Sequence, residues 1–227
     1  MKKKIIVYSM MIILLFTMQF QVYGETNSQI DLEERKIDPN KPMVALTFDD
    51  GPSEKYTPEI LDVLKDNYSL GTFFVLGTEV EKNKELLNRM IKEGNQIGNH
   101  TYNHKNLTIL SDEELSNELD STQNIIIESG DYTPTIMRPP YGYVNDGLRK
   151  KLYMSVVLWT LDARDWENRN TEIICNNILE NVKDGDIILM HDIYESTAEA
   201  VKIIVPELKS RGYQLVTIDE LNSIKKK

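Results

Sequence analysis

The chain has 227 residues, which suits one folded domain with a short appendage. Its 26 Lys and Arg residues stand against 36 Asp and Glu residues, and the resulting formal net charge of −10 argues against a nucleic-acid-binding protein, which needs a basic face to neutralise phosphates. A single cysteine excludes an intramolecular disulfide framework and a cysteine-cluster zinc module.

The N-terminus has the three parts of a secretory signal peptide. Lys2–Lys4 give a positive start, residues 5–20 are apolar, and Val22 and Gly24 fit the last positions before a cleavage site. We predict a signal peptide over residues 1–24, so the protein is expected to be secreted or to reside in the cell wall or at the cell surface. The alternative is an uncleaved N-terminal anchor, which would then be the expected contact of the chain with a membrane. The apolar run is slightly short for a full membrane span.

Residues 25–41 are polar and lack a hydrophobic period, so we predict a linker there, followed by a folded domain over residues 42–227. In chain order, the expected strands of this domain cover residues 44–48, 72–76, 96–98, 135–138, 155–159, 187–190 and 214–217. The expected helices alternate with them and cover residues 58–67, 80–93, 111–129, 146–151, 171–181, 197–210 and 218–224.

This alternation gives about seven strand–helix units, which predicts an α/β fold with a parallel sheet and right-handed crossovers. A doubly wound open sheet and a closed barrel both fit the pattern. A full barrel of eight units needs about 250 residues. A barrel in this shorter chain is therefore expected to be small or incomplete.

In either fold the loops after the strands carry the chemistry, so polar residues just past each apolar run matter most. The first expected strand is followed by Asp49, Asp50, Gly51 and Pro52. Two adjacent carboxylates repel each other unless a nearby cation offsets their charge and gives them separate roles. The alternative is an Asp-Gly-Pro turn in which one Asp only caps the chain, but this explains neither the second Asp nor its position at a strand end.

Any imidazole chemistry must use His100, His104 and His191, the three histidines of the chain. His100 and His104 follow the third expected strand, and their i, i+4 spacing predicts that both rings lie on one side of a helical turn, as a metal ion requires. This spacing alone is a weak signal. Together with an Asp after the first strand, it makes a reasonable three-ligand set for a catalytic divalent metal with open positions.

Two further residues stand at strand ends. Arg138 precedes two prolines that stiffen the chain, and there it could hold a carboxylate ionised; the alternative is a surface Arg on a rigid turn. His191 directly follows the sixth expected strand. An Asp from a neighbouring loop could orient its ring and raise its pKa so that the ring acts as a general acid. Taken alone, such a histidine is more often structural or solvated.

Five motifs of the chain resemble those of the polysaccharide deacetylases of carbohydrate esterase family four, the NodB-type domain. In the family's order they are TFDDGP at 47–52, HTYNH at 100–104, RPPYG at 138–142, DARDW at 162–166 and LMH at 189–191. The resemblance covers residues 42–221. It implies a distorted, incomplete (β/α) barrel, in agreement with the count of about seven units, and a metal-dependent hydrolase that removes N-linked acetyl groups from N-acetylglucosamine residues of a polysaccharide.

The resemblance also implies roles for the residues that bind metal and activate water. Asp50, His100 and His104 resemble the ligands of a divalent metal, with Zn²⁺ first and Co²⁺ as the alternative. Asp49 resembles the general base that takes a proton from water. Arg138 resembles the partner that holds this base in place and ionised.

The remaining roles concern the leaving group and the acetyl group. His191 resembles the general acid for the leaving amine, and Asp165 resembles the carboxylate that orients it. Tyr141 is similar to the residue whose backbone N–H faces the developing oxyanion. Trp166 and Leu189 are similar to the walls of the small pocket for the acetyl methyl group.

The expected partner is an acetylated glycan, with peptidoglycan and chitin oligomers ahead of acetylated xylan, and the protein is expected to be a monomer. Two other classes stay open from the residues alone. Two histidines and a carboxylate also serve non-haem iron oxygenases, but those are usually built on double-sheet β folds rather than on strand–helix alternation. A non-catalytic glycan-binding domain would need neither a base nor an acid.

Overall fold

A computed structural model describes residues 35–225 of the chain. The predicted signal peptide over residues 1–24 lies outside this range. Within it, no helix is long and apolar enough to cross a membrane. Residues 35–41, the described part of the predicted linker, are bound to the domain: the N–H of Asp38 donates to Oε1 of Gln214 at 2.7 Å, and the carbonyl of Asp38 accepts from Nε2 of Gln214 at 2.8 Å.

The strands of the described residues form one sheet, and each pair of neighbouring strands is parallel. They are β1 (Met43–Asp49), β2 (Thr72–Val75), β3 (Gln96–Asn99), β4 (Ile136–Met137), β5 (Ser155–Val156), β6 (Leu161–Asp162), β7 (Ile187–His191) and β8 (Gln214–Leu215). The order across the sheet is β5-β4-β3-β2-β1-β7-β6, and β8 pairs with the start of β1.

This order is cyclic, as in a barrel: it runs from β1 through β2, β3 and β4 to β5 on one side, and through β7 to β6 on the other. A doubly wound sheet instead reverses its order at a switch point. Within residues 35–225 no backbone pairing joins β5 to β6, so the barrel is incomplete at the connection over residues 157–160, which we call the seam. The predicted incomplete (β/α) barrel is confirmed, and the doubly wound alternative is wrong.

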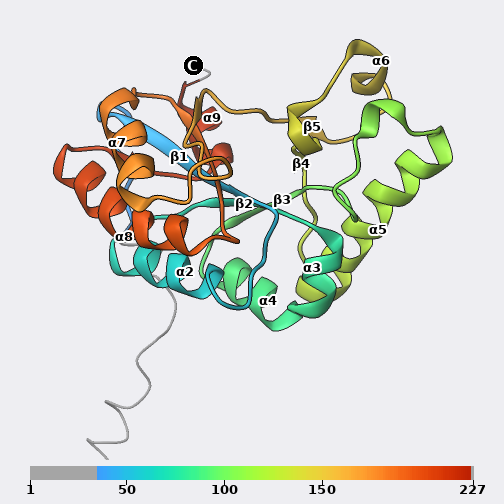
Figure 1. Ribbon diagram of the computed structural model, residues 1–227, viewed down its shortest axis with the longest axis horizontal. Coiled ribbons are helices and arrows are strands. Elements are labelled where there is room, and N and C mark those ends of the chain that lie inside the picture. Colours follow the sequence, from blue (N-terminus) through green and yellow to red (C-terminus); the bar gives the residue numbers. More distant parts are fainter. Residues whose placement is uncertain (1–34, 226–227) are drawn as a thin grey trace, which may run out of the picture. The chain divides into compact units, whose positions relative to one another are not determined.

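The helices lie around the strands (Figure 1). Helices α7, α8 and α2 pack side by side, and α3 and α4 both pack against α5. Their bounds are α2 (Thr57–Asp66), α3 (Gly77–Lys82), α4 (Lys84–Lys92), α5 (Asp112–Gly130), α6 (Asp146–Arg149), α7 (Thr171–Asn181), α8 (Glu195–Ser210) and α9 (Ile218–Lys225). Single 3₁₀ turns cover Leu107–Ile109 and Pro140–Gly142.

Strand β1 lies between β2 and β7 and is buried over its whole length. Such a continuous buried run is typical of parallel sheets that are covered on both faces. The register places Asp49 beside Phe74 of β2 and beside His191 of β7. Asp49 and His191, far apart in the sequence, are therefore direct neighbours across the carboxyl end of the sheet.

Two element boundaries differ from the predicted ones. The helix predicted over residues 80–93 is two helices, because the chain breaks at Asn83, whose side chain donates to the carbonyls of Glu79 at 3.0 Å and Pro52 at 3.1 Å. The strand predicted over residues 155–159 covers only Ser155–Val156 (β5), because the carbonyls of Val157 and Leu158 accept from the side chain of Arg138, and β6 begins beyond the predicted range at Leu161.

Helix α5 has a capped N-terminus and a buried apolar face. The N–H of Ser111 donates to Oε2 of Glu114 at 2.9 Å, and the N–H of Glu114 donates to Oγ of Ser111 at 3.3 Å, which forms the predicted capping box. Leu115, Leu119 and Ile126 are buried on the inner face of the helix. Capping and apolar packing together hold α5 against the sheet.

Candidate active site

A cavity of about 580 Å³ lies at the carboxyl ends of the strands. Its lining residues are Asp49, Asp50, His100, His104, Tyr141, Gly142, Tyr143, Trp159, Asp162, Trp166, Leu189, His191 and Tyr194. Eight of the ten predicted site residues are in this set, and the other two, Arg138 and Asp165, are fully buried and hydrogen-bonded to Asp49 and His191. The fold thus brings together residues from five separate motifs.

Asp50, His100 and His104 form a group that could hold a metal ion, which we call the metal triad. Oδ1 of Asp50 lies 3.3 Å from Nε2 of each histidine, and this buried oxygen has no hydrogen-bond partner among the described residues. Burial alone would raise the pKa of Asp50, but its interactions with the two histidines outweigh burial and lower the pKa to about 2. An ionised carboxylate and two imidazole nitrogens that converge on one point fit a divalent metal.

Backbone and aromatic contacts orient the two histidine rings. Nδ1 of His100 lies 2.7 Å from the carbonyl oxygen of Arg138, which can only accept, so Nδ1 carries a hydrogen and Nε2 is the ring nitrogen that faces Asp50. The ring of His104 makes an edge contact with Tyr141, with the ring centroids 4.7 Å apart. Burial lowers the pKa of His104, which favours the neutral ring that a metal binds.

The segment over residues 100–104, which we call the histidine loop, is not helical, so the predicted helical turn is wrong. Thr101 and His104 have positive φ angles of 72° and 58°. The N–H of His104 donates to Oγ1 of Thr101 at 3.0 Å, and the N–H of Thr101 donates to Oδ1 of Asn99 at 2.8 Å. These bonds replace a helical ladder, and the two imidazole rings still meet, with centroids 5.0 Å apart.

Arg138 is fully buried and binds Asp49. Nη1 of Arg138 donates to Oδ1 of Asp49 and to Oγ1 of Thr47, both at 2.8 Å. Nε and Nη2 of Arg138 donate to the carbonyls of Val157 and Leu158, each at 3.2 Å, so the same guanidinium also binds the start of the seam. The second oxygen of Asp49, Oδ2, is turned toward the metal triad.

His191 is held by a second buried carboxylate, Asp165. The N–H and Nδ1 of His191 lie 2.7 and 2.8 Å from the two oxygens of Asp165, and the hydroxyl of Thr197 donates to Oδ2 of Asp165 at 2.7 Å. Burial alone would lower the pKa of His191, but the hydrogen bond and charge of Asp165 outweigh burial and raise the pKa to about 9. Nδ1 is thereby occupied, and Nε2 is the ring nitrogen left for the cavity.

The cavity walls include residues outside the predicted set. Leu189 is buried and Trp166 is half-exposed, and Nε1 of Trp166 donates to Oδ2 of Asp162 at 3.2 Å. Asp162 and Trp159 stand at or just after the fifth expected strand, so the rule of looking past each strand end could have found both. Tyr194 lies three positions after His191, and no sequence signal marks it.

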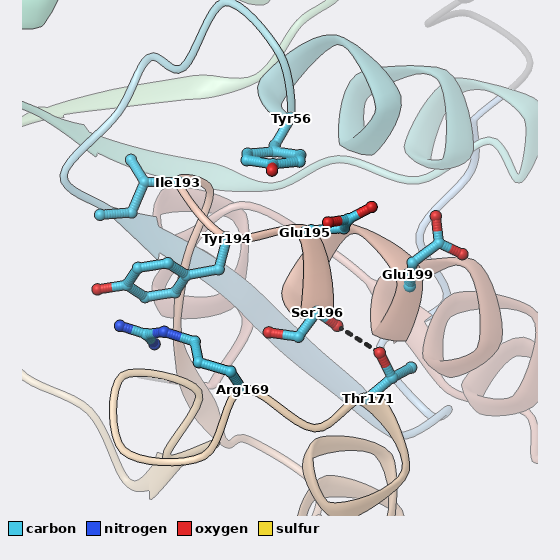
Figure 2. A pocket seen from close by; sticks show the side chains of 8 residues that line it. All are labelled: Tyr56, Arg169, Thr171, Ile193, Tyr194, Glu195, Ser196 and Glu199. Carbon is cyan, nitrogen blue, oxygen red and sulfur yellow. Dashed lines mark hydrogen bonds between the residues drawn. The ribbon is translucent and has the colours of Figure 1, made fainter.

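A second cavity, of about 480 Å³, adjoins the first at Tyr194, which lines both. Figure 2 shows it at the start of α8. The guanidinium of Arg169 lies against the ring of Tyr194, 3.2 Å from its centroid. The other lining residues are Tyr56, Thr171, Ile193, Glu195, Ser196 and Glu199.

A buried carboxylate also lies behind Asp50. Asp192 is fully buried, and its Oδ2 accepts a hydrogen bond from the hydroxyl of Thr57. Burial raises the pKa of Asp192 to about 7. A Cβ atom at Gly51 would overlap the oxygens of Asp192, so only glycine fits next to Asp50. The glycine of the Asp-Asp-Gly-Pro sequence is thus required by this close approach.

Comparison with known proteins gives matches in sequence and in fold. The sequence model described as "Polysaccharide deacetylase" matches residues 36–154. The peptidoglycan-N-acetylmuramic acid deacetylase PdaC of Bacillus subtilis is 46% identical over 194 residues, which cover 86% of this chain and 42% of PdaC. A peptidoglycan-N-acetylglucosamine deacetylase of Bacillus cereus is 41% identical over 190 residues, which cover 80% of this chain and 89% of that protein.

The structural comparison agrees with the sequence comparison. A solved structure of PdaC is similar with a TM-score of 0.82 and 46% identity, and the match covers 84% of this chain and 94% of that chain. This chain spans less than half the length of PdaC, whose sequence continues beyond the shared domain. Sequence model, relatives and fold all agree, and the chain belongs to the polysaccharide deacetylase family.

Proposed function

We propose that this protein is a metal-dependent hydrolase that removes N-linked acetyl groups from N-acetylglucosamine residues of a cell-wall glycan. The proposal rests on two proton-transfer groups beside the metal triad. Asp49 and His191 are neighbours in the β1–β7 ladder, and each is held by its own buried partner, Arg138 or Asp165. A glycan-binding module would need neither group, and a parallel α/β sheet disfavours an iron oxygenase.

Asp49 is proposed to activate the water that attacks the acetyl carbonyl. An amide is a poor electrophile, so the attack needs assistance. A divalent cation held by the metal triad supplies Lewis-acid polarisation of the carbonyl and lowers the pKa of water. Asp49 is fixed by Arg138 through Oδ1, and its Oδ2, on the side of the metal triad, accepts the proton of the attacking water.

His191 is proposed to assist the departure of the amine. The nitrogen of an amide leaves only when it receives a proton, and His191, kept protonated by Asp165, donates this proton from Nε2 as the C–N bond breaks. We assign the backbone N–H of Tyr141 to the developing oxyanion, because its turn lines the cavity. Trp166 and Leu189 are assigned to the walls around the acetyl methyl group.

Mass spectrometry of digested peptidoglycan and of chitin oligomers tests the proposal, with peptidoglycan ranked first. An acetyl group is expected to be lost from N-acetylglucosamine. The relatives divide on the sugar, since the Bacillus cereus protein is named for N-acetylglucosamine and PdaC for N-acetylmuramic acid. The 46% identity to PdaC makes the muramic acid residue the second candidate, and loss of acetyl from that sugar alone would overturn the first.

Removal of divalent metal is expected to abolish activity, and addition of Zn²⁺ or Co²⁺ is expected to restore it. We propose Zn²⁺ as the resident metal, because one carboxylate with two imidazoles is a ligand set of catalytic zinc. The measurement is acetate release from N-acetylated oligosaccharides after exhaustive chelation, with the metal content determined on the same samples. Full turnover by metal-free protein would contradict the metal role.

The pKa of His191 predicts a loss of turnover at alkaline pH. With a pKa raised to about 9, the ring is protonated at neutral pH, and kcat is expected to fall as pH rises through about 9. Asp165→Asn removes the charge that raises this pKa, so the alkaline limb is expected to move toward lower pH. Profiles of kcat against pH for both proteins provide the check, and an unmoved limb in Asp165→Asn would argue against the acid role.

The N-terminal segment supports a proposal on location. We propose that residues 1–24 direct export and that residues 42–227 form the catalytic domain outside the cell or in its wall, since the proposed substrate lies there. The relatives named above are named for peptidoglycan, which agrees with an extracellular site of action.

A further inference from the structure

The histidine loop cannot hold its own shape by regular hydrogen bonding. Two of its residues, Thr101 and His104, have left-handed backbone angles that non-glycine residues rarely adopt. Where such an irregular loop is shielded from water, its backbone groups must find partners outside a regular ladder. Its carbonyls find them in α3: the carbonyl of Thr101 accepts from the N–H of Gly77 at 3.0 Å, and that of Tyr102 accepts from the N–H of Thr78 at 3.2 Å.

Two N–H groups of the same loop, those of Tyr102 and Asn103, find their partner in a single side chain, Glu118 of α5. Oε2 of Glu118 accepts from the N–H of Tyr102 at 3.0 Å and from the N–H of Asn103 at 2.7 Å. Oε1 accepts from Nδ2 of Asn103 at 3.0 Å and lies 3.1 Å from Nζ of Lys105. One carboxylate thus binds the chain at three residues, namely Tyr102 and Asn103 between the two histidines and Lys105 just after them.

Glu118 is itself almost completely buried, with 3% of its side chain exposed. Burial alone would raise the pKa of Glu118, but the hydrogen bonds from Asn103 and Lys105 outweigh burial and lower the pKa. The group is therefore a buried carboxylate, and burying a charge is unfavourable unless its hydrogen bonds compensate. The compensating bonds all come from residues 102–105, so the orientation of the carboxylate and the shape of the loop depend on each other.

We propose that Glu118 is a positioning residue for the metal site: it fixes the histidine loop so that Nε2 of His100 and Nε2 of His104 face Oδ1 of Asp50 before any metal arrives. This inference rests on the metal role proposed above. Helix α5 does not need Glu118 for its own attachment, because its capping box and its apolar face hold it. Glu118 therefore stabilises the conformation of the histidine loop rather than the attachment of the helix.

The test is the affinity for Zn²⁺ of the full chain carrying Glu118→Gln, measured by competition with a chromogenic chelator. Gln keeps the size of the side chain but has one acceptor oxygen in place of two and turns an NH₂ group toward donors. Changes in the groups that orient metal ligands typically weaken metal binding by about 10- to 100-fold, and a loss of this size is expected. The visible absorption of bound Co²⁺ is expected to change as well, because it reports the arrangement of the ligands.

Glu114→Gln is the matched control. It makes the same chemical change on the same helix and weakens the capping box, but Glu114 bonds to Ser111 and not to the histidine loop. It is expected to lower the stability of the protein and to leave Zn²⁺ affinity within about twofold of the original. Equal Zn²⁺ affinity in Glu118→Gln and the original protein, or equal losses in both variants, would overturn the proposal.

A milder variant covers the case in which Glu118→Gln does not fold. Glu118→Asp keeps the charge but is one methylene shorter, so it cannot reach the N–H groups of both Tyr102 and Asn103, and Zn²⁺ binding is expected to weaken severalfold. Unchanged Zn²⁺ affinity and an unchanged Co²⁺ spectrum in this folded variant would overturn the proposal equally. If the original protein binds no metal, the proposed function itself fails, and the two failures are therefore distinguishable.

Discussion

Asp49→Asn is expected to lower kcat by about 10²- to 10⁴-fold, the usual contribution of a positioned general base, while the protein still binds its metal. Asn has the shape of Asp and can still accept the hydrogen bond that Nη1 of Arg138 gives to Oδ1 at 2.8 Å. It cannot take a proton from water. The measurement is amine release from N-acetylated oligosaccharides under saturating substrate, with Zn²⁺ content determined on the same sample.

The neighbouring carboxylate provides the contrast. Asp50→Asn is the same chemical change one position along the chain, but Asp50 presents its Oδ1 to both imidazoles. This variant is expected to lose metal as well as turnover. If Asp49→Asn kept near-original turnover with metal bound, or if both variants lost metal alike, the division of tasks between the two carboxylates would be wrong.

Arg138→Met is expected to destabilise the folded protein by about 3–5 kcal/mol, the usual effect of removing one partner of a buried ion pair. The change leaves the charge of Asp49 buried without its partner, and it removes the donor from Thr47 and from two carbonyls of the seam. Since whole domains are stable by only about 5–15 kcal/mol, this is a large fraction of the total. The free energy of unfolding in urea provides the measurement.

A double variant separates the charge from the shape. Combining Arg138→Met with Asp49→Asn removes both charges, so the double variant is expected to be more stable than Arg138→Met alone. What loss remains then belongs to the unpaired seam carbonyls. A loss below about 1 kcal/mol in Arg138→Met would be the range of an exposed pair and would show that the buried pair does not stabilise this fold.

Elements with local signals could be predicted from the sequence. The apolar run in β1 identified a buried strand, and the pair Ser111 and Glu114 marked the start of α5, because both signals lie within a few residues of the structure they create. The strand–helix alternation predicts the parallel α/β fold, the chain length limits any barrel to an incomplete one, and the choice of a barrel over a doubly wound sheet comes from the resemblance to a known family. The site residues were identified by their positions at strand ends and by their resemblance to a known family.

Features that depend on distant partners could not be predicted in this way. The break between α3 and α4 is set by Asn83 bonding to Pro52, which is 31 residues away in the sequence. The spacing of His100 and His104 predicts a helical turn, whereas Glu118 of α5 bonds to the N–H groups of Tyr102 and Asn103, which lie 16 and 15 residues away in the sequence, and supports another shape. Each of these contacts links residues that no local pattern relates.

The seam between β5 and β6 has a consequence for the lifetime of the competent site. Backbone pairing holds the other strand neighbours, whereas at the seam the carbonyls of Val157 and Leu158 bond to Arg138, which also binds Asp49. Regions open locally at free energies below that of global unfolding, and an opening of the seam would remove two of the bonds that hold the guanidinium beside the base. The fraction of time for which the base is in place therefore depends on the local stability of the seam, so a thermodynamic property of the scaffold influences the turnover rate.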